Sequence, residues 1–326
     1  MSTKERVLEL LLTRKGIFTS GEDIARELSL SRNAIWRAME SLRADGWEID
    51  AVTNKGYSLL GNPVLVRAET IKPLLSPDAP FDVKTFKTVT STNTLLKAEA
   101  ERDAPEGRIF IASEQTGGKG RMGRSFYSPL GTGVYISILL RPTFSPSESL
   151  CITTAAAVAM AEAIEATAGT KPRIKWVNDI YVNEKKVCGI LTEAAFDMEQ
   201  NRLRYAVLGI GINLVEPEGG YPQDIAQVAS PVFTREEYSA LKRDELIAAL
   251  INRFWHYYEH LTDKEFLAGY QNRSMLDGRE VNVIGSGCLR PAVALGVDDE
   301  FRLRVRYPDG SEELLQSGDV SVKPRA

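Results

Sequence analysis

The sequence predicts an α+β protein in three parts: a winged helix-turn-helix over residues 1–62, a mixed α/β domain over residues 63–275 and a small β-barrel over residues 276–326. Three observations predict this division. The first part has three amphipathic helix patterns followed by a hairpin pattern. The middle part alternates helix and strand patterns, and the last part holds only short strand patterns between glycine and aspartate turns.

The N-terminal part follows the order helix, helix, turn, helix, hairpin. Apolar residues within 7–12 predict the first helix, Ser20 begins the second, and Ser31 caps a third helix that Gly46 ends. Residues 47–59 alternate between apolar and polar side chains around a turn, which predicts a β-hairpin. This order is typical of a winged helix-turn-helix.

The polar face of the third predicted helix and the tip of the predicted wing carry candidate DNA contacts, because arginine and asparagine read base edges well. These candidates are Arg32, Asn33, Trp36, Arg37 and Lys55. Residues 1–62 contain nine basic and nine acidic residues, so nonspecific attraction to DNA is weak and binding as a dimer is expected. A winged helix used for protein contact or autoregulation is the alternative.

The middle part begins after the turn signal Gly61-Asn62-Pro63. Residues 133–140 and 205–214 predict apolar strands, residues 151–168 a largely buried helix, and residues 244–260 a long amphipathic helix. In the last part, the predicted strands are 280–284, 292–297, 301–307 and 312–315, which suggest a small barrel.

Composition narrows the class of protein. The net charge of −4 argues against a surface coated in basic patches. The three cysteines are too few and too scattered for a disulfide framework or a metal cluster, and His256 and His260 are expected on an exposed helix face. The N-terminus lacks a signal-peptide pattern and no uninterrupted apolar run reaches the length of a membrane span, so we expect a cytoplasmic protein without a membrane partner.

The richest chemical signal is residues 117–124, Gly-Gly-Lys-Gly-Arg-Met-Gly-Arg. Glycines let backbone N–H groups face a ligand, and lysine and arginine supply charge for a phosphate or carboxylate. The run therefore predicts an anion-binding loop for a polyphosphate, with a solvated basic turn as the alternative. It is not a Walker A loop, because its spacing differs.

Together with four other segments, this loop resembles the signature of the biotin–protein ligases. The segments occur in the family's order: Ser91-Thr92-Asn93, Gly118–Arg124, Lys175-Trp176-Val177-Asn178-Asp179-Ile180, Lys186-Val187-Cys188-Gly189-Ile190-Leu191 and Gly209-Ile210-Gly211-Ile212-Asn213-Leu214. Five matches in order make chance agreement very improbable, and the resemblance extends to both end domains.

The resemblance implies an activity. Members of this family form biotinyl-5′-AMP from biotin and ATP with Mg²⁺, and transfer biotin to a lysine of the biotin carboxyl carrier protein of acetyl-CoA carboxylase or of another biotin-dependent carboxylase. It also implies a catalytic domain of the biotin/lipoate ligase type and an SH3-like barrel. The bifunctional members act, in addition, as homodimeric repressors that bind operator DNA of biotin genes.

The resemblance also assigns roles to residues. The implied catalytic residues are Lys186, Arg121 and Asp179, of which Asp179 is also the candidate for holding Mg²⁺ or orienting the acceptor amine. The implied biotin-binding residues are Ser91, Thr92, Asn93, Gln115, Gly118, Lys119, Gly120, Arg121, Lys186, Gly209 and Gly211. The implied ATP-binding residues are Lys119, Arg121, Arg124, Trp176, Asn178, Lys186 and Asn213.

Physical arguments support some of these roles and leave alternatives for others. A buried ureido ring needs hydrogen-bond partners, because each unpaired group costs about 1–3 kcal/mol, and Ser91, Thr92 and Gln115 can supply them. The same Ser-Thr-Asn string is a common helix N-cap. Lys186 could instead be a surface turn lysine, Asp179 a cap or turn residue, and the side chain next to it in the motif, Trp176, could pack against either adenine or the core.

Departures from the family pattern occur at Lys119, where arginine is frequent, at Met122, and at Val177, which replaces a proline. They put the retention of the adenylate in doubt more than the type of reaction. Residues 117–124 and 216–230 are candidate lids that shield the anhydride from water. The rival functions are a lipoate-type ligase and a biotin-sensing transcription factor without ligase activity.

Overall fold

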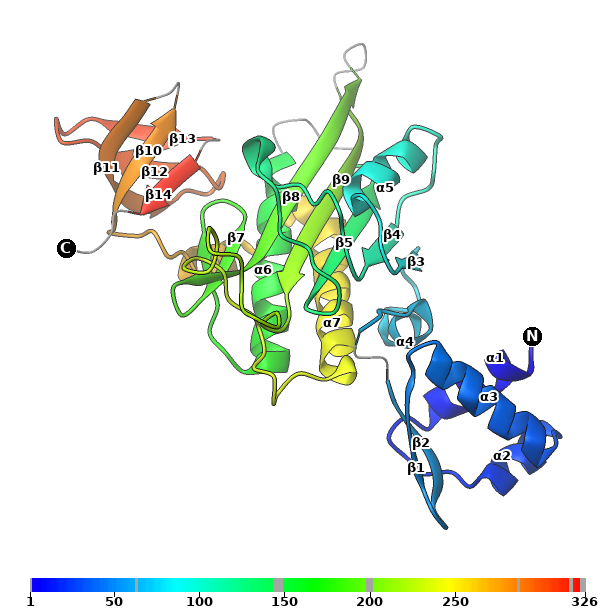
Figure 1. Ribbon diagram of the computed structural model, residues 1–326. Coiled ribbons are helices and arrows are strands. Elements are labelled where there is room, and N and C mark those ends of the chain that lie inside the picture. Colours follow the sequence, from blue (N-terminus) through cyan, green and yellow to red (C-terminus); the bar gives the residue numbers. More distant parts are fainter. Residues whose placement is uncertain are drawn as a thin grey trace.

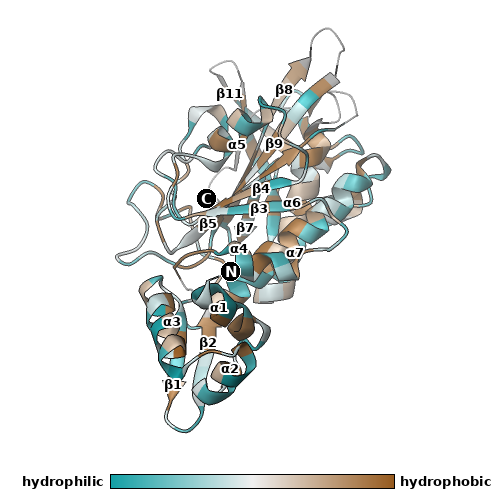
Figure 2. Cartoon of the chain, turned by 90° about the vertical axis from the view of Figure 1, so that its right-hand side faces the viewer, coloured by the Kyte–Doolittle hydropathy of each residue, from teal (hydrophilic) through white to brown (hydrophobic). Residues whose placement is uncertain are grey.

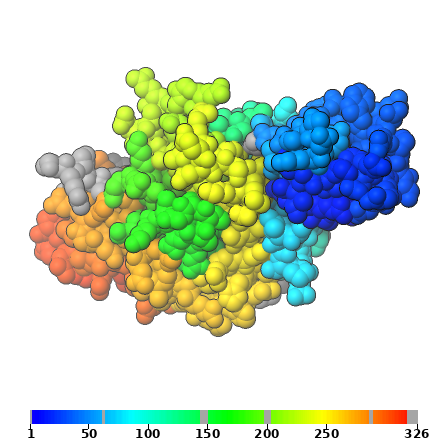
Figure 3. All heavy atoms as spheres, turned by 90° about the horizontal axis from the view of Figure 1, so that it is seen from below, coloured from blue at the N-terminus to red at the C-terminus, as the bar shows by residue number. Residues whose placement is uncertain are grey.

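A computed structural model describes residues 2–61, 64–142, 149–197, 202–285, 288–316 and 319–322 of the chain. The chain forms three units in a row. Figures 1 and 3 show the N-terminal unit in blue and the C-terminal unit in orange to red at opposite ends of the central domain.

The N-terminal unit has the predicted order of helices and hairpin. It consists of α1 (Thr3–Thr13), α2 (Gly21–Leu28), α3 (Arg32–Ala44), β1 (Glu48–Val52) and β2 (Gly56–Gly61). Ser20 and Ser31 cap α2 and α3, since their hydroxyls accept backbone N–H bonds from Asp23 and Ala34. Apolar side chains of all three helices and the hairpin form a core separate from that of the central domain.

The central domain is built on a seven-stranded sheet with the order β3-β4-β5-β9-β8-β7-β6, in which only β3 and β4 run parallel. The strands are β3 (Asp82–Phe86), β4 (Arg108–Ala112), β5 (Gly133–Leu140), β6 (Arg173–Lys175), β7 (Asp179–Val182), β8 (Lys185–Asp197) and β9 (Arg202–Asn213). The helices are α4 (Ala68–Ile71), α5 (Thr92–Ala100), α6 (Ser149–Ala168), α7 (Ala240–Glu259) and α8 (Leu267–Asn272), with short 3-10 turns at Lys72–Leu74, Arg121–Gly123 and Leu261–Asp263.

The two faces of this sheet have different tasks. Even-numbered residues of β5, β9 and β8 pack with α6 and α7 into the main core, whereas Leu139 and Val207 pack against α5 on the opposite face. In Figure 2 the long strands β8 and β9 are mainly in the brown shades of apolar residues. Residues 150–168 of α6 form a helix long and apolar enough to cross a membrane. However, 67% of its most apolar 18-residue stretch is buried in the protein, as expected for a core helix.

The C-terminal unit is a five-stranded antiparallel sheet with the order β13-β12-β11-β10-β14. Its strands are β10 (Glu280–Gly285), β11 (Cys288–Val297), β12 (Leu303–Arg306), β13 (Glu312–Leu315) and β14 (Asp319–Val322). The sequence had not indicated β14. The sheet is compatible with the predicted barrel, although the strand pairings of the described residues do not include one between β13 and β14 that would close it.

The N-terminal unit rests on the start of α7. Lys15 Nζ lies 3.9 Å from a carboxylate oxygen of the buried Asp244, and Arg67 donates to the backbone carbonyl of Asp45 at 2.7 Å. The domain limits remain predictions: β2 ends at Gly61 and β10 begins at Glu280, while Asn62 and Pro63 lie outside the described residues.

Candidate active site

A pocket opens on the face of the sheet that carries α5. Residues from β5, β8 and β9, from the start of α5 and from the glycine–basic loop line it. Its lining includes these predicted site residues: Ser91, Thr92, Asn93, Gln115, Lys119, Gly120, Arg121, Asn178, Lys186, Gly209 and Gly211.

Glycines make room for the pocket at its floor. In the paired strands Ser137 lies opposite Gly209, and Tyr135 lies opposite Gly211. A Cβ atom on Gly209 would come within 2.8 Å of Asn93 Cγ and Nδ2, and one on Gly211 would come within 2.6 Å of the Phe126 ring. The Gly-Ile-Gly pattern therefore places isoleucine in the core and leaves the other face open for Asn93 and Phe126.

One end of the pocket is polar and uncharged. The Ser91 hydroxyl caps α5 by accepting the Thr94 N–H at 3.4 Å, so the capping interpretation of this string is confirmed. The Thr92 backbone N–H donates to Gln115 Oε1 at 2.8 Å, and the Thr92 hydroxyl lies 3.1 Å from the same oxygen. Since these three side chains also line the pocket, capping and ligand contact are compatible.

The other end is cationic. Lys186 Nζ lies 2.6 Å from Asp179 Oδ1, and Arg121 donates to Asn178 Oδ1 at 3.0 Å. Asn178 is itself fixed because its amide donates to the Ile190 carbonyl at 2.7 Å. Lys186 is thus held on β8 beside the pocket by a carboxylate, and it is not a solvated turn lysine.

The segment 216–230 holds the backbone of Lys186. The Lys186 N–H donates to the Val228 carbonyl at 2.7 Å, and the Ser230 N–H donates to the Lys186 carbonyl at 2.9 Å. Asn213 bonds the carbonyls of Lys186 and Ser230. This segment therefore frames the cationic end of the pocket, and Asn213 acts on it from outside the lining.

The loop 117–124 forms one wall. Gly118 has no room for a side chain, because a Cβ atom there would lie 2.5 Å from the Phe126 carbonyl and the Ser128 hydroxyl. Met122 is left-handed, with φ of 54°, and its side chain is 68% exposed. The loop also borders a second, more open hollow, which Lys119–Arg124, Leu191 and Glu193 line.

Trp176 lies elsewhere. Its side chain is buried in the main core, and its indole N–H donates to the Phe301 carbonyl of the C-terminal unit at 2.8 Å. The structure therefore supports the core alternative for this residue and does not bring it to the pocket. Asp179 pairs with Lys186 but is not itself among the residues that line the pocket. Arg124 borders the outer hollow.

Comparison with known proteins identifies the family. The chain is 36% identical to the bifunctional ligase/repressor BirA of Bacillus subtilis (strain 168), over 98% of this chain and 98% of that protein. The chain belongs to this family of bifunctional ligase/repressors. It is 28% identical to the BirA of Escherichia coli (strain K12), over 96% of each chain. The model of the biotin/lipoate A/B protein ligase family matches residues 85–213, and that of an HTH domain matches residues 3–58.

A solved structure supports the fold assignment. The biotin protein ligase from Aquifex aeolicus, determined in complex with biotin and ATP, superposes with a TM-score of 0.61 and 26% identity, and the match covers 75% of this chain and 99% of that one. The α+β fold class and the resemblance to this family are therefore confirmed.

Sequence reasoning missed several residues of the ligase pocket. Phe126 and Tyr135 line it, and Ser137 and Glu193 lie in contact with Asn93. The alternation along β5 gave a signal, since Tyr135 and Ser137 are its two polar side chains within an apolar run. Glu193 gave none, because its place in the site depends on the pairing of β8 with β9.

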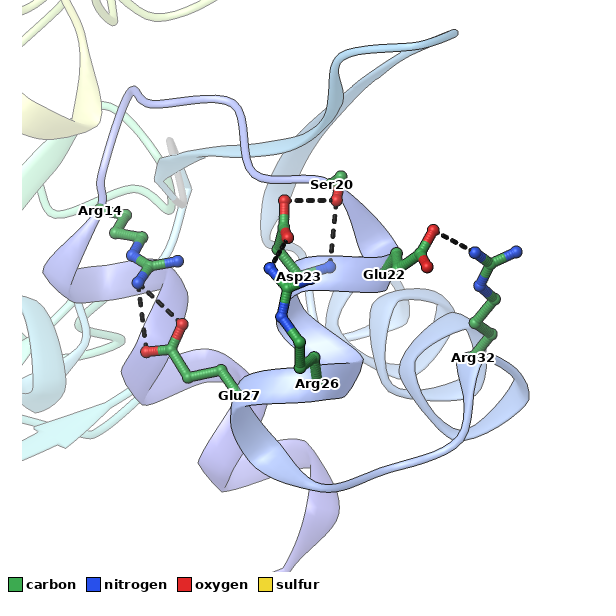
Figure 4. Close-up of polar contacts among 7 residues, drawn as sticks. All are labelled: Arg14, Ser20, Glu22, Asp23, Arg26, Glu27 and Arg32. Carbon is green, nitrogen blue, oxygen red and sulfur yellow. Dashed lines mark hydrogen bonds and ion pairs between the residues drawn. The ribbon is translucent and has the colours of Figure 1, made fainter.

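The N-terminal unit of a bifunctional member should present a DNA-reading surface. All four α3 candidates are exposed: Arg32 forms an ion pair with Glu22 of α2, and Trp36 is 57% exposed. Figure 4 shows this pair beside Asp23 with Arg26 and Arg14 with Glu27. Lys55 at the wing tip lies 5.9 Å from the Phe18 ring centroid. Acidic partners thus neutralise part of this surface.

The two histidines lie at the C-terminal end of α7. The side chains of His256 and His260 are 49% and 52% exposed at the end of α7 and lie beside Glu265 and Asp263. Among the described residues no group of three histidine, cysteine or acidic side chains is placed to hold a metal ion.

Proposed function

We propose that the central domain joins biotin to ATP in this pocket and then transfers biotin to a lysine of a carrier protein. The observation that carries the proposal is that the lining of one pocket divides into neutral polar side chains, Ser91, Thr92 and Gln115, and cationic side chains, Lys119, Arg121 and Lys186. Biotin has the same division, with a ureido ring at one end and a carboxylate at the other.

In the first step, a carboxylate oxygen of biotin attacks the α-phosphorus of ATP. The bond from that phosphorus to the bridging oxygen breaks, and pyrophosphate leaves with its electron pair. Both reactants are anions, so positive charge and positioning dominate the catalysis. Lys186 and Arg121 supply this charge, and their partners Asp179 and Asn178 fix their direction before substrate arrives. We assign ATP to Lys119, Arg121, Arg124, Asn178 and Lys186, with Asn213 supporting Lys186.

Mg²⁺ fits as an ion that arrives with ATP. Magnesium usually keeps several waters and takes one or two carboxylates together with substrate phosphates. Asp179 is the carboxylate that pairs with Lys186, and it fits a single contact of that kind. The bound ion would neutralise charge on the phosphates.

In the second step, the neutral amine of the acceptor lysine attacks the carbonyl carbon of the anhydride, AMP leaves, and the amine loses a proton. Asp179 is our candidate for orienting this amine. The segments 117–124 and 216–230 border the site and would shield the anhydride from water. The acceptor is the carrier protein of acetyl-CoA carboxylase or of another biotin-dependent carboxylase.

We propose that the N-terminal unit binds operator DNA of biotin genes as part of a cytoplasmic homodimer. Arg32, Asn33, Trp36 and Arg37 would enter the major groove, and Lys55 would contact phosphate from the wing. The balanced charge of residues 1–62 favours two copies on a two-fold site.

Biotin-dependent exchange between pyrophosphate and ATP tests the ligase proposal. Exchange with biotin and none with lipoate is expected, and exchange with lipoate alone would support the rival ligase. Absence of exchange with both acids, combined with biotin binding, would favour the pure sensor. A gel-shift assay on a biotin-gene promoter fragment, with and without biotin and ATP, tests repression separately, and unchanged mobility in every lane would contradict it.

A further inference from the structure

A chain of hydrogen bonds runs under the polar end of the pocket. Ser137 is fully buried on β5, with its hydroxyl 2.6 Å from Asn93 Oδ1 and 2.7 Å from the Thr92 hydroxyl. The Asn93 amide nitrogen lies 2.9 Å from Glu193 Oε2, and Lys97 Nζ lies 2.8 Å from Glu193 Oε1. The chain thus connects a carboxylate on β8 with a hydroxyl that lines the pocket.

The directions of these bonds follow from the carboxylate. Burial alone would raise the pKa of Glu193, but hydrogen bonds from Lys97 and Asn93 outweigh it and lower the pKa, so the group is ionised and only accepts. Asn93 must therefore turn its amide nitrogen to Glu193 and its oxygen to Ser137. Because that oxygen only accepts, the single proton of Ser137 is donated to it.

The last member of the chain is then also determined. The oxygen of Ser137 can only accept from Thr92, and Gln115 Oε1, which takes the Thr92 backbone N–H, can likewise only accept. Whichever of these two oxygens receives it, the hydroxyl proton of Thr92 stays within the protein. Thr92 therefore offers a lone pair to the pocket.

We propose that Ser137 and Glu193 are positioning residues that fix the Thr92 hydroxyl as a hydrogen-bond acceptor, so that this end of the pocket selects a ring N–H group. The identification of that group as a ureido N–H rests on the proposed function. Ser137 and Glu193 do not touch the ligand; they act through Thr92 and Asn93 on which ligand is accepted.

Two substitutions disturb the chain in different ways. Ser137→Ala removes the donor to Asn93 and the acceptor for Thr92, which frees Thr92 to rotate. Glu193→Gln replaces an acceptor-only group with an amide that can also donate, so Asn93 can turn over and reverse every bond up to Thr92. Lys97→Met is the matched control for charge, because it removes the ion pair and leaves the carboxylate facing Asn93.

Thr192→Val is the matched control for a lost hydroxyl. Thr192 neighbours Glu193 on β8, and its hydroxyl pairs with Thr153 of α6 at 2.7 Å, away from the chain of bonds. Its replacement removes one part-buried hydrogen bond between hydroxyls without touching Asn93 or Ser137.

The test is titration calorimetry of the full chain with biotin, with ATP, and with two cyclic carbamates in which oxygen replaces one or the other ring N–H. For Ser137→Ala we expect about a tenfold rise in the Kd of biotin with an unchanged Kd of ATP. For the wild type, the Kd of at least one carbamate should exceed that of biotin by about a hundredfold or more, because its ring oxygen and the Thr92 oxygen are both acceptors and would face each other. Glu193→Gln should shrink that preference at least tenfold, and both controls should retain it.

The results separate the two proposals. The positioning role is overturned if Ser137→Ala and Glu193→Gln weaken the binding of biotin and of the carbamates by equal factors. It is also overturned if neither substitution changes the preference for biotin over the carbamates. Should Ser137→Ala fail to fold, the preference measured with Glu193→Gln decides alone. If the wild type binds no biotin at all, the proposed function fails, and with it the assignment of the ureido group.

Discussion

Substituting alanine at Gly209 should close the ligand pocket from below. The new Cβ atom would lie within 2.8 Å of three atoms of the Asn93 side chain, of which Oδ1 is the nearest, and that oxygen must then move about 1 Å to reach ordinary contact at 3.4 Å. Asn93 cannot make this movement without stretching its bonds to Ser137 at 2.6 Å and to Glu193 at 2.9 Å. Overpacking of this kind costs about 1–3 kcal/mol, and each weakened buried hydrogen bond adds roughly 1 kcal/mol.

We therefore expect Gly209→Ala to destabilise the central domain by about 3–5 kcal/mol, which lowers its melting temperature by several degrees, and to weaken biotin binding at least tenfold. Gly120→Ala is the control: Gly120 lines the same pocket, but a Cβ atom there meets nothing closer than 3.4 Å. Thermal unfolding and biotin titration measure both effects. A Gly209→Ala protein that matches the wild type in melting temperature and biotin affinity would refute the steric reasoning.

Three further outcomes are expected. Lys186→Ala should reduce biotin-dependent exchange by about a hundredfold or more with the fold intact by circular dichroism, because the developing negative charge loses its closest cation; undiminished exchange would exclude that role. Arg37→Ala should weaken operator binding by about 1–3 kcal/mol in a gel-shift titration while leaving exchange unchanged. Because folding lowers the pKa of Glu193 below its ordinary value of 4.5, ionised Glu193 stabilises the folded protein. This contribution to the free energy of unfolding is complete at a pH above 4.5 and is lost as the pH falls through the lower pKa of the folded state. The gap in melting temperature between wild type and Glu193→Gln should shrink over that window, and a constant gap would contradict this.

The helices and strands with strong periodicity could be predicted from the sequence. Residues 133–140 were expected as a strand and form β5, and Ser31 caps α3 as expected, because capping and apolar alternation are local. The full length of β8 was not predicted. Along that strand Gly189 and Leu191 line the pocket and Glu193 lines the outer hollow, so the pattern lacks the regular polar face of a half-exposed strand.

Site residues that belong to a sequence motif could be predicted, whereas those that reach the site only through the order of the strands could not. Ser91 and Lys186 belong to motifs, and the pocket contains both. Ser137 and Glu193 meet at Asn93 only because β9 lies between their strands and its Gly209, which pairs with Ser137 and Leu191, leaves room for the Asn93 side chain. No pattern within one segment records such a neighbour relation. Trp176 is the opposite case: it belongs to a motif and was among the implied ATP-binding residues, but it contacts the C-terminal unit at Phe301 instead of the pocket.

The ligand pocket and the N-terminal unit are connected through one segment of the chain and one ion pair. The segment that holds the Lys186 backbone at Val228 and Ser230 continues into α7. Near its start α7 carries Asp244, and Lys15 of the N-terminal unit lies 3.9 Å from that carboxylate. A change at the cationic end of the pocket could therefore act on the N-terminal unit through the chain from Ser230 to Asp244 and the ion pair of Asp244 with Lys15. Linkage requires that any such effect be reciprocal: operator DNA must change the affinity for biotin by the same factor by which biotin changes the affinity for DNA.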